Sequence, residues 1–108
     1  MAFIAGELSL EVIGALRPVV PKIKARHKDL ADQLMRAANS VALNLGEAEL
    51  SDPGNRRARL FSAAASAKES LTALRIAGKW GFITAEQLEP AAGLLRRIIA
   101  ILWKMTRG

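Results

Sequence analysis

Two stripes of polar and small side chains recur at helical spacing in this alanine-rich chain, and they constrain its fold more than any other feature. The first stripe comprises Gln33, Arg36, Ser40, Asn44 and Glu47, and the second comprises Arg59, Ser62, Ser66, Glu69 and Ala73. Steps of three and four residues follow one face of an α-helix. Two such stripes on consecutive helices predict close packing around a polar network. Its expected members are Gln33, Arg36, Ser40, Asn44, Glu47, Ser66 and Glu69.

Composition favours an all-α fold. Hydrophobic residues make up 51% of the 108 residues but aromatic residues only 5%, so aliphatic side chains and alanine must build the core. No segment alternates with period two in β-branched residues, so strands are not expected. We predict a single domain over residues 1–108, folded as an antiparallel up-down-up-down four-helix bundle. The helices are expected at about residues 6–24, 29–50, 53–80 and 85–106.

The first three helices carry recognisable boundary signals. Pro18 and Pro21 each remove a backbone donor, which predicts a kink in the first helix. Asp29 is the expected N-cap of the second helix, because its carboxylate can accept hydrogen bonds from free amides of the first turn. Asp52 followed by Pro53 is typical of the N-cap and first position of the third.

The third helix is expected to end at Gly81, which can adopt a left-handed backbone conformation. Thr84 and Gln87 then have the spacing of a capping box for the fourth helix. Pro90 is expected to loosen the first turns, so that the firm helix begins near Ala91.

The fourth helix has an unusually wide apolar face. Its cations occupy an arc of about 100°, and apolar side chains fill roughly 200° of the remaining wheel. One bundle core needs a stripe about half that wide, so the surplus predicts a homo-oligomer. The residues expected at the oligomer interface are Ile98, Ile101, Leu102 and Met105. The alternative is a central helix in an irregular monomer.

The chain is basic, with a formal charge of +6 and a pI near 10.5. Such a charge is compatible with binding to nucleic acid. The candidate phosphate-contacting residues are Lys22, Lys24, Arg26, Lys28, Arg57, Lys68, Arg75 and Lys79, the last four on one face of the third helix. The alternative is a solvated face that confers solubility. Trp80, Phe82 and Trp103 are interpreted as packing residues, which disfavours single-strand binding by stacking and leaves backbone contact with structured RNA or DNA open.

Catalytic chemistry is not expected. The chain has no cysteine, and its only histidine, His27, cannot supply the Glu-x-x-His pairs that metal centres in helical bundles need. The serines of the stripes lack a nearby general base, and there is no glycine-rich phosphate loop. We therefore expect no enzyme activity, no metal and no other cofactor. Glu7 and Glu11 occupy positions where an export signal would carry basic residues, so a cytoplasmic location is expected.

The segment from Asp32 to Glu47 resembles the signature of the four-helix-bundle proteins encoded in intervening sequences of bacterial 23S ribosomal RNA genes. That pattern is a glutamine-leucine, an arginine-alanine, a serine, an asparagine and a glutamate, here at Gln33-Leu34, Arg36-Ala37, Ser40, Asn44 and Glu47. Ala65 to Glu69 is similar to the family's glycine-serine-x-x-glutamate element, with Ala65 replacing the glycine. Gly46-Glu47-Ala48 departs from the usual alanine-glutamate-glycine. The resemblance covers roughly Leu8 to Thr106.

The resemblance implies a homo-oligomer, typically a pentamer, of antiparallel four-helix bundles. The family's function is mostly unassigned. A related branch, the accessory variability determinant of diversity-generating retroelements, is a basic pentameric barrel that binds nucleic acid and a reverse transcriptase. Five copies of this chain would carry a formal charge of about +30. Two hypotheses follow: a non-enzymatic oligomeric scaffold that binds RNA or DNA mainly through phosphates, or a protein-binding adaptor or structural ring. No membrane partner is expected, because assembly needs the apolar faces.

Overall fold

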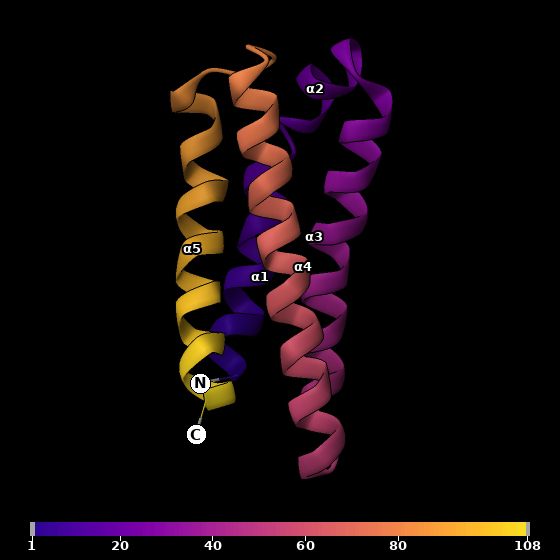
Figure 1. The fold of residues 1–108 in the computed structure, drawn as a ribbon, viewed down its shortest axis with the longest axis vertical. Helices are drawn as coiled ribbons and strands as arrows, with labels where there is room; N and C mark the ends of the chain where they lie inside the picture. Colours follow the sequence, from indigo (N-terminus) through magenta and orange to yellow (C-terminus); the bar gives the residue numbers. More distant parts are fainter. Residues whose placement is uncertain (1, 108) are drawn as a thin grey trace.

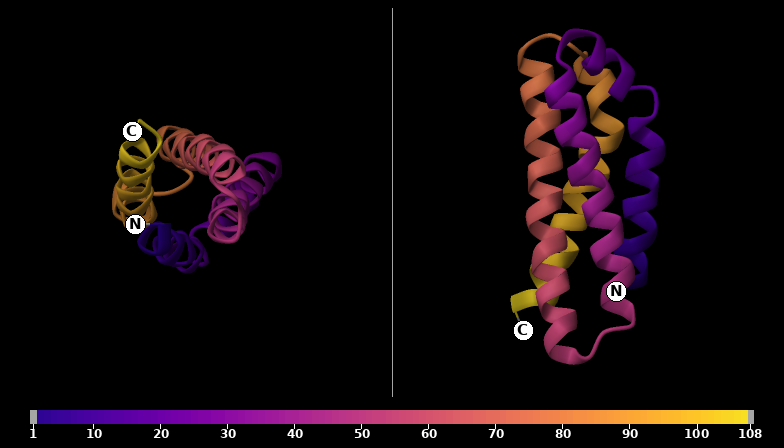
Figure 2. Two further views of the ribbon diagram at one scale, coloured as in Figure 1. Left: turned by 90° about the horizontal axis from the view of Figure 1, so that it is seen from below. Right: turned by 90° about the vertical axis from the view of Figure 1, so that its right-hand side faces the viewer.

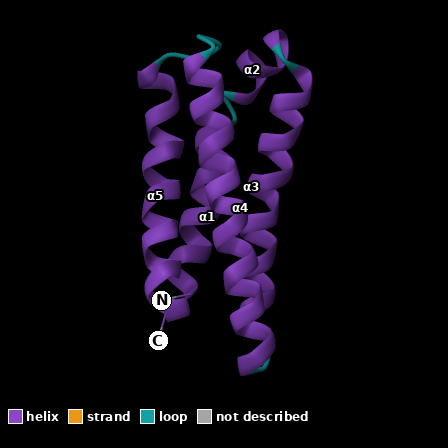
Figure 3. Ribbon diagram, viewed as in Figure 1, coloured by secondary structure: helices purple, strands orange, loops and turns teal. Residues whose placement is uncertain are grey.

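The computed structural model describes the backbone of residues 2–107 and the side chains of residues 4–107. Within this range the chain is all-α and contains no strand, as predicted (Figure 3). The helices are α1 (Ala2–Leu16), α2 (Val20–Arg26), α3 (Lys28–Glu49), α4 (Pro53–Lys79) and α5 (Ala85–Arg107). The four longer helices run alongside one another, and the short α2 lies at one end (Figure 1).

The helices enclose a common core in an elongated molecule of 42 × 21 × 19 Å. α3 packs against α4 and α4 against α5, whereas α1 contacts both α3 and α5 (Figure 2). The turn from α4 to α5 lies at the same end as α2, and we call this the α2 end. Both chain termini and the turn from α3 to α4 lie at the opposite end (Figure 1).

The core is aliphatic. Its largest fully buried side chains are Ile23, Leu34, Leu45, Leu74, Leu95, Ile98 and Leu102. Each such side chain contributes about 1.5–3 kcal/mol on burial. α4 adds mainly alanines, including Ala63, Ala67 and Ala77, all fully buried. Small side chains let the helix axes approach closely, so the core of residues 4–107 is filled without a fully buried aromatic ring. The aromatic residues of this range consequently lie at the surface and at the helix ends.

The helix expected at residues 6–24 is two helices. Hydrogen bonds from Arg17 N to the Gly14 carbonyl, 3.4 Å, and from Val19 N to the Leu16 carbonyl, 3.0 Å, tighten the end of α1 into turns. Pro18 has no N–H to continue the ladder, and its ring would clash with the carbonyl four residues back. Pro21 then lies in the first turn of α2, where no donor is needed. The prolines therefore break the helix where only a kink was predicted.

The N-cap predicted for α3 is wrong. His27, not Asp29, caps the helix, because the His27 Nδ1 accepts a hydrogen bond from the Leu30 amide at 3.1 Å. Asp29 lies inside the first turn, where a negative charge favours the helix dipole. The N-cap predicted for α4 is confirmed: the Asp52 Oδ1 accepts from the Asn55 amide at 3.0 Å.

The end of α4 and the start of α5 also match their predicted chemistry. Gly81 has φ +79°, and the capping box is complete: the Thr84 amide donates to Gln87 Oε1 at 2.8 Å and the Gln87 amide to Thr84 Oγ1 at 3.1 Å. The predicted loosening at Pro90 is wrong, because α5 is continuous from Ala85. Pro90 is exposed and removes a single ladder bond, while the buried Ala91 holds the next turn in the core.

Candidate functional site

A polar network joins α3 to α4. Ser66 Oγ on α4 donates to Ser40 Oγ on α3 at 2.9 Å. Asn44 Nδ2 donates to the Ser40 carbonyl at 2.9 Å and to Ser40 Oγ at 3.1 Å. Arg59 forms an ion pair with Glu47 at 2.9 Å, and its Nη1 lies 3.5 Å from Asn44 Oδ1. The structure thus places four of the seven expected members in one network, with Arg59 as an added donor from the second stripe.

The remaining three expected members, Gln33, Arg36 and Glu69, are exposed and make none of these contacts. Ser40, Asn44 and Ser66 are half-buried. The stripes therefore follow the rim of the α3–α4 contact, because alanines occupy its centre. One inward polar group was missed: Ser70 is fully buried and donates to the Ser66 carbonyl at 2.9 Å.

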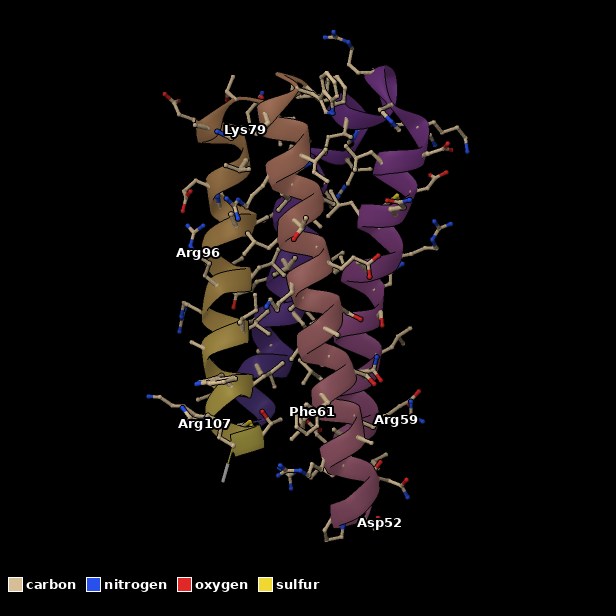
Figure 4. The ribbon with its side chains drawn as sticks, in the orientation of Figure 1. Asp52, Arg59, Phe61, Lys79, Arg96 and Arg107 are labelled. Atoms are coloured by element: carbon tan, nitrogen blue, oxygen red, sulfur yellow. The ribbon has the colours of Figure 1, made fainter. Side chains whose placement is uncertain are left out.

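All eight candidate phosphate-contacting residues are exposed, but they do not form one patch. Lys22, Lys24 and Arg26 lie on α2, and Lys28 begins α3. Arg75 and Lys79 lie in the last turns of α4, which end beside α2; Figure 4 shows Lys79 at this end. These six residues therefore lie on the helix segments at the α2 end. Lys68 lies near the middle of α4, and Arg57 lies in its second turn, at the opposite end.

Most cations at the α2 end have no acidic partner. The ion pairs among residues 4–107 are Lys28–Asp32, Arg59–Glu47 and Arg96–Glu89. The 2.8 Å hydrogen bond between Lys28 and Asp32 raises the pKa of the lysine and lowers the pKa of the carboxyl. Five cations at this end are in no ion pair of the described residues: Lys22, Lys24, Arg26, Arg75 and Lys79. Their charges are therefore not neutralised by direct ion pairs within the described part of the chain.

The interpretation of the aromatic residues as packing residues is wrong for the two tryptophans. Trp80 is 70% exposed and Trp103 is 60% exposed. The Trp80 ring lies nearly parallel to Phe82, with an interplanar angle of 14° and centroids 6.4 Å apart. The Arg26 guanidinium lies 5.4 Å from the Phe82 centroid, and the His27 ring lies 6.3 Å from it. We call Arg26, His27, Trp80 and Phe82 the aromatic corner; it lies at the α2 end.

The sequence did contain a signal for this corner. Trp80 and Phe82 flank Gly81, the residue that ends α4, and a helix-ending turn has few neighbours that could cover two large rings. Two further rings on the opposite half of the molecule also have cations over them. Arg57 lies 5.2 Å from the Phe61 centroid and Arg107 lies 4.7 Å from the Trp103 centroid. Aromatic and cationic groups are thus adjacent at three places.

The residues expected at an oligomer interface face inward. Ile98 and Leu102 are 0% exposed within the single chain, so they are unavailable to another subunit. Ile101 and Met105 are half-buried against the same core. The wide apolar arc of α5 packs against two other helices of the same chain, because α5 contacts both α1 and α4. The sequence argument had assumed a single core-facing side.

The outer surface between α4 and α5 carries a groove of about 590 Å³ with a mixed lining. The lining includes Phe61, Lys68, Arg96, Ile99, Trp103 and Arg107. Figure 4 shows Phe61 and Arg107 towards the end with the termini and Arg96 nearer the middle of α5. Among residues 4–107 there is no group of three acidic or histidine side chains placed to hold a metal ion. None of the described helices combines the length and apolar character needed to cross a membrane.

These features define a small, basic, all-α protein with an alanine-lined core, a polar contact between α3 and α4, and a cationic end. The chain belongs to the 23S rRNA-intervening sequence protein family, whose model matches residues 5–104. It is similar in fold to a protein of unknown function from the S23 ribosomal protein family of Bacteroides thetaiotaomicron VPI-5482. The two share 20% identity over 96% of this chain and 99% of the other, with a TM-score of 0.85. No functionally curated protein matches the chain significantly.

Proposed function

We propose that the protein is a non-enzymatic oligomeric scaffold that binds RNA or DNA mainly through its phosphates. In this proposal the whole chain is one domain, an up-down-up-down four-helix bundle, and it assembles as a ring in the cytoplasm. The observation that carries the proposal is the set of five exposed cations without ion-pair partners at the α2 end: Lys22, Lys24, Arg26, Arg75 and Lys79. A relation to the accessory variability determinant is part of the same proposal.

The size of the cationic end suits a short stretch of nucleic acid. The molecule is 21 × 19 Å across its shorter axes, which corresponds to roughly six base pairs of a duplex at 3.4 Å per step. Lysine and arginine side chains that neutralise phosphates release condensed counterions, so affinity falls as salt rises. Five such contacts give a slope of about −4.5 in log affinity against log salt for one protomer on a duplex.

Charge reversal at two of these cations tests the placement. The Arg75→Glu/Lys79→Glu double variant should bind a labelled RNA duplex more weakly and with a shallower salt dependence, measured by fluorescence anisotropy. Both side chains are exposed, so the melting temperature should stay close to that of the parent. The matched control is Arg97→Glu/Lys104→Glu, which makes the same charge change at exposed positions of α5.

If both double variants weaken binding equally, net charge alone drives the association and the placement at the α2 end is wrong. Unchanged affinity of Arg75→Glu/Lys79→Glu would also contradict the placement of the phosphate contacts at the α2 end. Light scattering during size-exclusion chromatography tests the ring. A mass of five protomers supports the stoichiometry that the family resemblance implies, and a monomer contradicts the ring.

A protein-binding adaptor is the second candidate, favoured by an apolar groove between α1, α2 and α3. The groove measures about 290 Å³ and is lined by Ile13, Leu16, Val20, Pro21, Met35 and Ala38, with Arg17 and Asn39 at its polar side. Such a surface suits apolar side chains of a partner rather than phosphates. Protein purified without nuclease separates the two candidates. Excess absorbance at 260 nm supports the nucleic-acid scaffold, whereas a clean protein spectrum favours the adaptor.

A further inference from the structure

We propose that Trp80 is a stacking platform for an unpaired nucleobase, with Lys79 and Arg75 contacting the adjacent phosphates. The ligand class is therefore single-stranded RNA or DNA, or an unpaired segment within a structured nucleic acid. This inference rests on the proposed function and deepens it, because phosphate contact alone does not distinguish paired from unpaired strands.

The indole is placed as a platform requires. Trp80 follows directly after α4, and 70% of its surface is exposed. Its ring is close to parallel with Phe82, at 14° and a centroid separation of 6.4 Å. At this separation the two nearly parallel rings are offset, and most of the Trp80 surface is open to solvent. A nucleobase stacked on the exposed part of the indole would lie nearly parallel to the Phe82 ring as well.

The turn that carries the two rings is held in place before any ligand binds. The Trp80 amide bonds the Ile76 carbonyl at 3.0 Å, and the Phe82 amide bonds the Ala77 carbonyl at 2.9 Å. Ile83, the next residue, is buried in the core. The Arg26 guanidinium also lies over the Phe82 ring, 5.4 Å from its centroid. A platform fixed in this way loses little conformational freedom on binding, which favours affinity.

Charge complementarity identifies the occupant. A shallow hollow of about 340 Å³ beside the indole is lined by Thr72, Arg75, Ile76, Lys79 and Trp80. Two of its five lining residues are cations that form no ion pair among the described residues. A base that stacks on Trp80 carries its phosphates within the same surface. Aromatic rings beside a cationic groove are the arrangement by which single strands are bound with little sequence preference.

Trp103 provides an internal control, because it is also exposed and is the chain's other tryptophan. It lies on α5 towards the opposite end, and the Arg107 guanidinium lies 4.7 Å from its ring centroid. Trp103→Phe leaves Trp80 as the sole tryptophan, and Trp80→Phe leaves Trp103. Stacking of a base on an indole quenches its fluorescence, so each variant reports on one ring only.

The experiment titrates both single-tryptophan proteins with poly(U) and with an RNA duplex. We expect saturable quenching by poly(U) in Trp103→Phe and much less in Trp80→Phe. In anisotropy measurements Trp80→Ala should lower the affinity for single-stranded RNA by about 5- to 150-fold. Its affinity for the duplex should stay within about twofold of the parent. Trp80→Phe should recover part of the single-strand affinity, because it restores an aromatic face, and Trp103→Ala should change neither affinity.

The results separate this inference from the function on which it rests. If Trp80→Ala binds single-stranded RNA like the parent while Arg75→Glu/Lys79→Glu does not, stacking is refuted and phosphate contact stands. Equal quenching of the two tryptophans also refutes the platform. If the parent binds neither poly(U) nor the duplex, the proposed function fails and the platform fails with it. Circular dichroism of Trp80→Ala should match the parent, since the side chain is mostly exposed.

Discussion

Replacing Asn44 with leucine tests how much this residue of the polar network contributes to stability, since it bonds Ser40 within α3 and lies beside Arg59 of α4. Leucine has as many side-chain heavy atoms as asparagine, branches at the same carbon and has a higher helix propensity, so the helix itself should not suffer. The substitution removes the two hydrogen bonds from Asn44 Nδ2 to Ser40, at 2.9 and 3.1 Å. It also removes the acceptor 3.5 Å from Arg59.

The expected loss follows from these contacts. Each intramolecular hydrogen bond contributes about 0.5–1.5 kcal/mol net, and water replaces part of this because Asn44 is half-buried. The Arg59–Glu47 pair is exposed and adds little. We therefore expect Asn44→Leu to lower the free energy of unfolding by about 1–2 kcal/mol. For a chain of this length, that lowers the melting temperature by roughly 4–8 °C.

The assay is urea and thermal unfolding followed by circular dichroism at one protein concentration, because oligomerisation makes stability depend on concentration. The matched control is Asn39→Leu, the same substitution at an exposed position of the same helix. It should change stability by less than about 0.5 kcal/mol. If Asn44→Leu is as stable as Asn39→Leu, the hydrogen bonds of Asn44 do not stabilise the fold and the reasoning is refuted.

Two further predictions concern the ends of α4. Gly81→Ala should destabilise the protein by about 1–2 kcal/mol, since alanine disfavours φ +79°. Its control is Gly14→Ala in α1, where the space around the Cβ position is open, and this variant should stabilise the protein by about 0.5–1 kcal/mol. Thermal unfolding that ranks the two variants in the opposite order would contradict this prediction. Hydrogen bonds from Asn55 lower the pKa of Asp52 below 3.8, so its capping stabilises most above the unfolded pKa and is lost as pH falls through the folded value. Asp52→Asn keeps a capping oxygen that does not titrate, so the stability of this variant relative to the parent should rise below about pH 4, measured by urea titrations. If the free energies of unfolding of variant and parent change in parallel with pH, Asp52 makes no such contribution.

The parts of the fold that depend on local chemistry could be predicted from the sequence. Asp52, Gly81 and the Thr84–Gln87 box act over three or four residues, so their spacing is sufficient evidence for a helix boundary. His27 was missed because a histidine accepts a capping hydrogen bond only when its ring nitrogen is turned towards the helix, and composition does not reveal that orientation.

Side-chain exposure could not be predicted as well, because it depends on helices far away in the chain. The burial of Ile98 follows from the contact of α5 with two helices, one of them the first in the chain. The exposure of Trp80 follows from a core that aliphatic side chains and alanines already fill. The basic residues were correctly expected on the surface, yet only the arrangement of α2 and the last turns of α4 shows that six of them belong to the same end of the molecule.

The position of α1 between α3 and α5 has a consequence for the order in which the chain folds. α1 is synthesised before both of its partners, and α5 is the later of the two. At about 5–20 residues per second, the apolar face formed by Leu8, Val12 and Leu16 waits roughly 5–20 s for α5. The hairpin of α3 and α4 makes its contacts between neighbouring segments and can form during that interval. Until α5 has been synthesised, the nascent chain therefore exposes apolar surface of α1 that chaperones could bind.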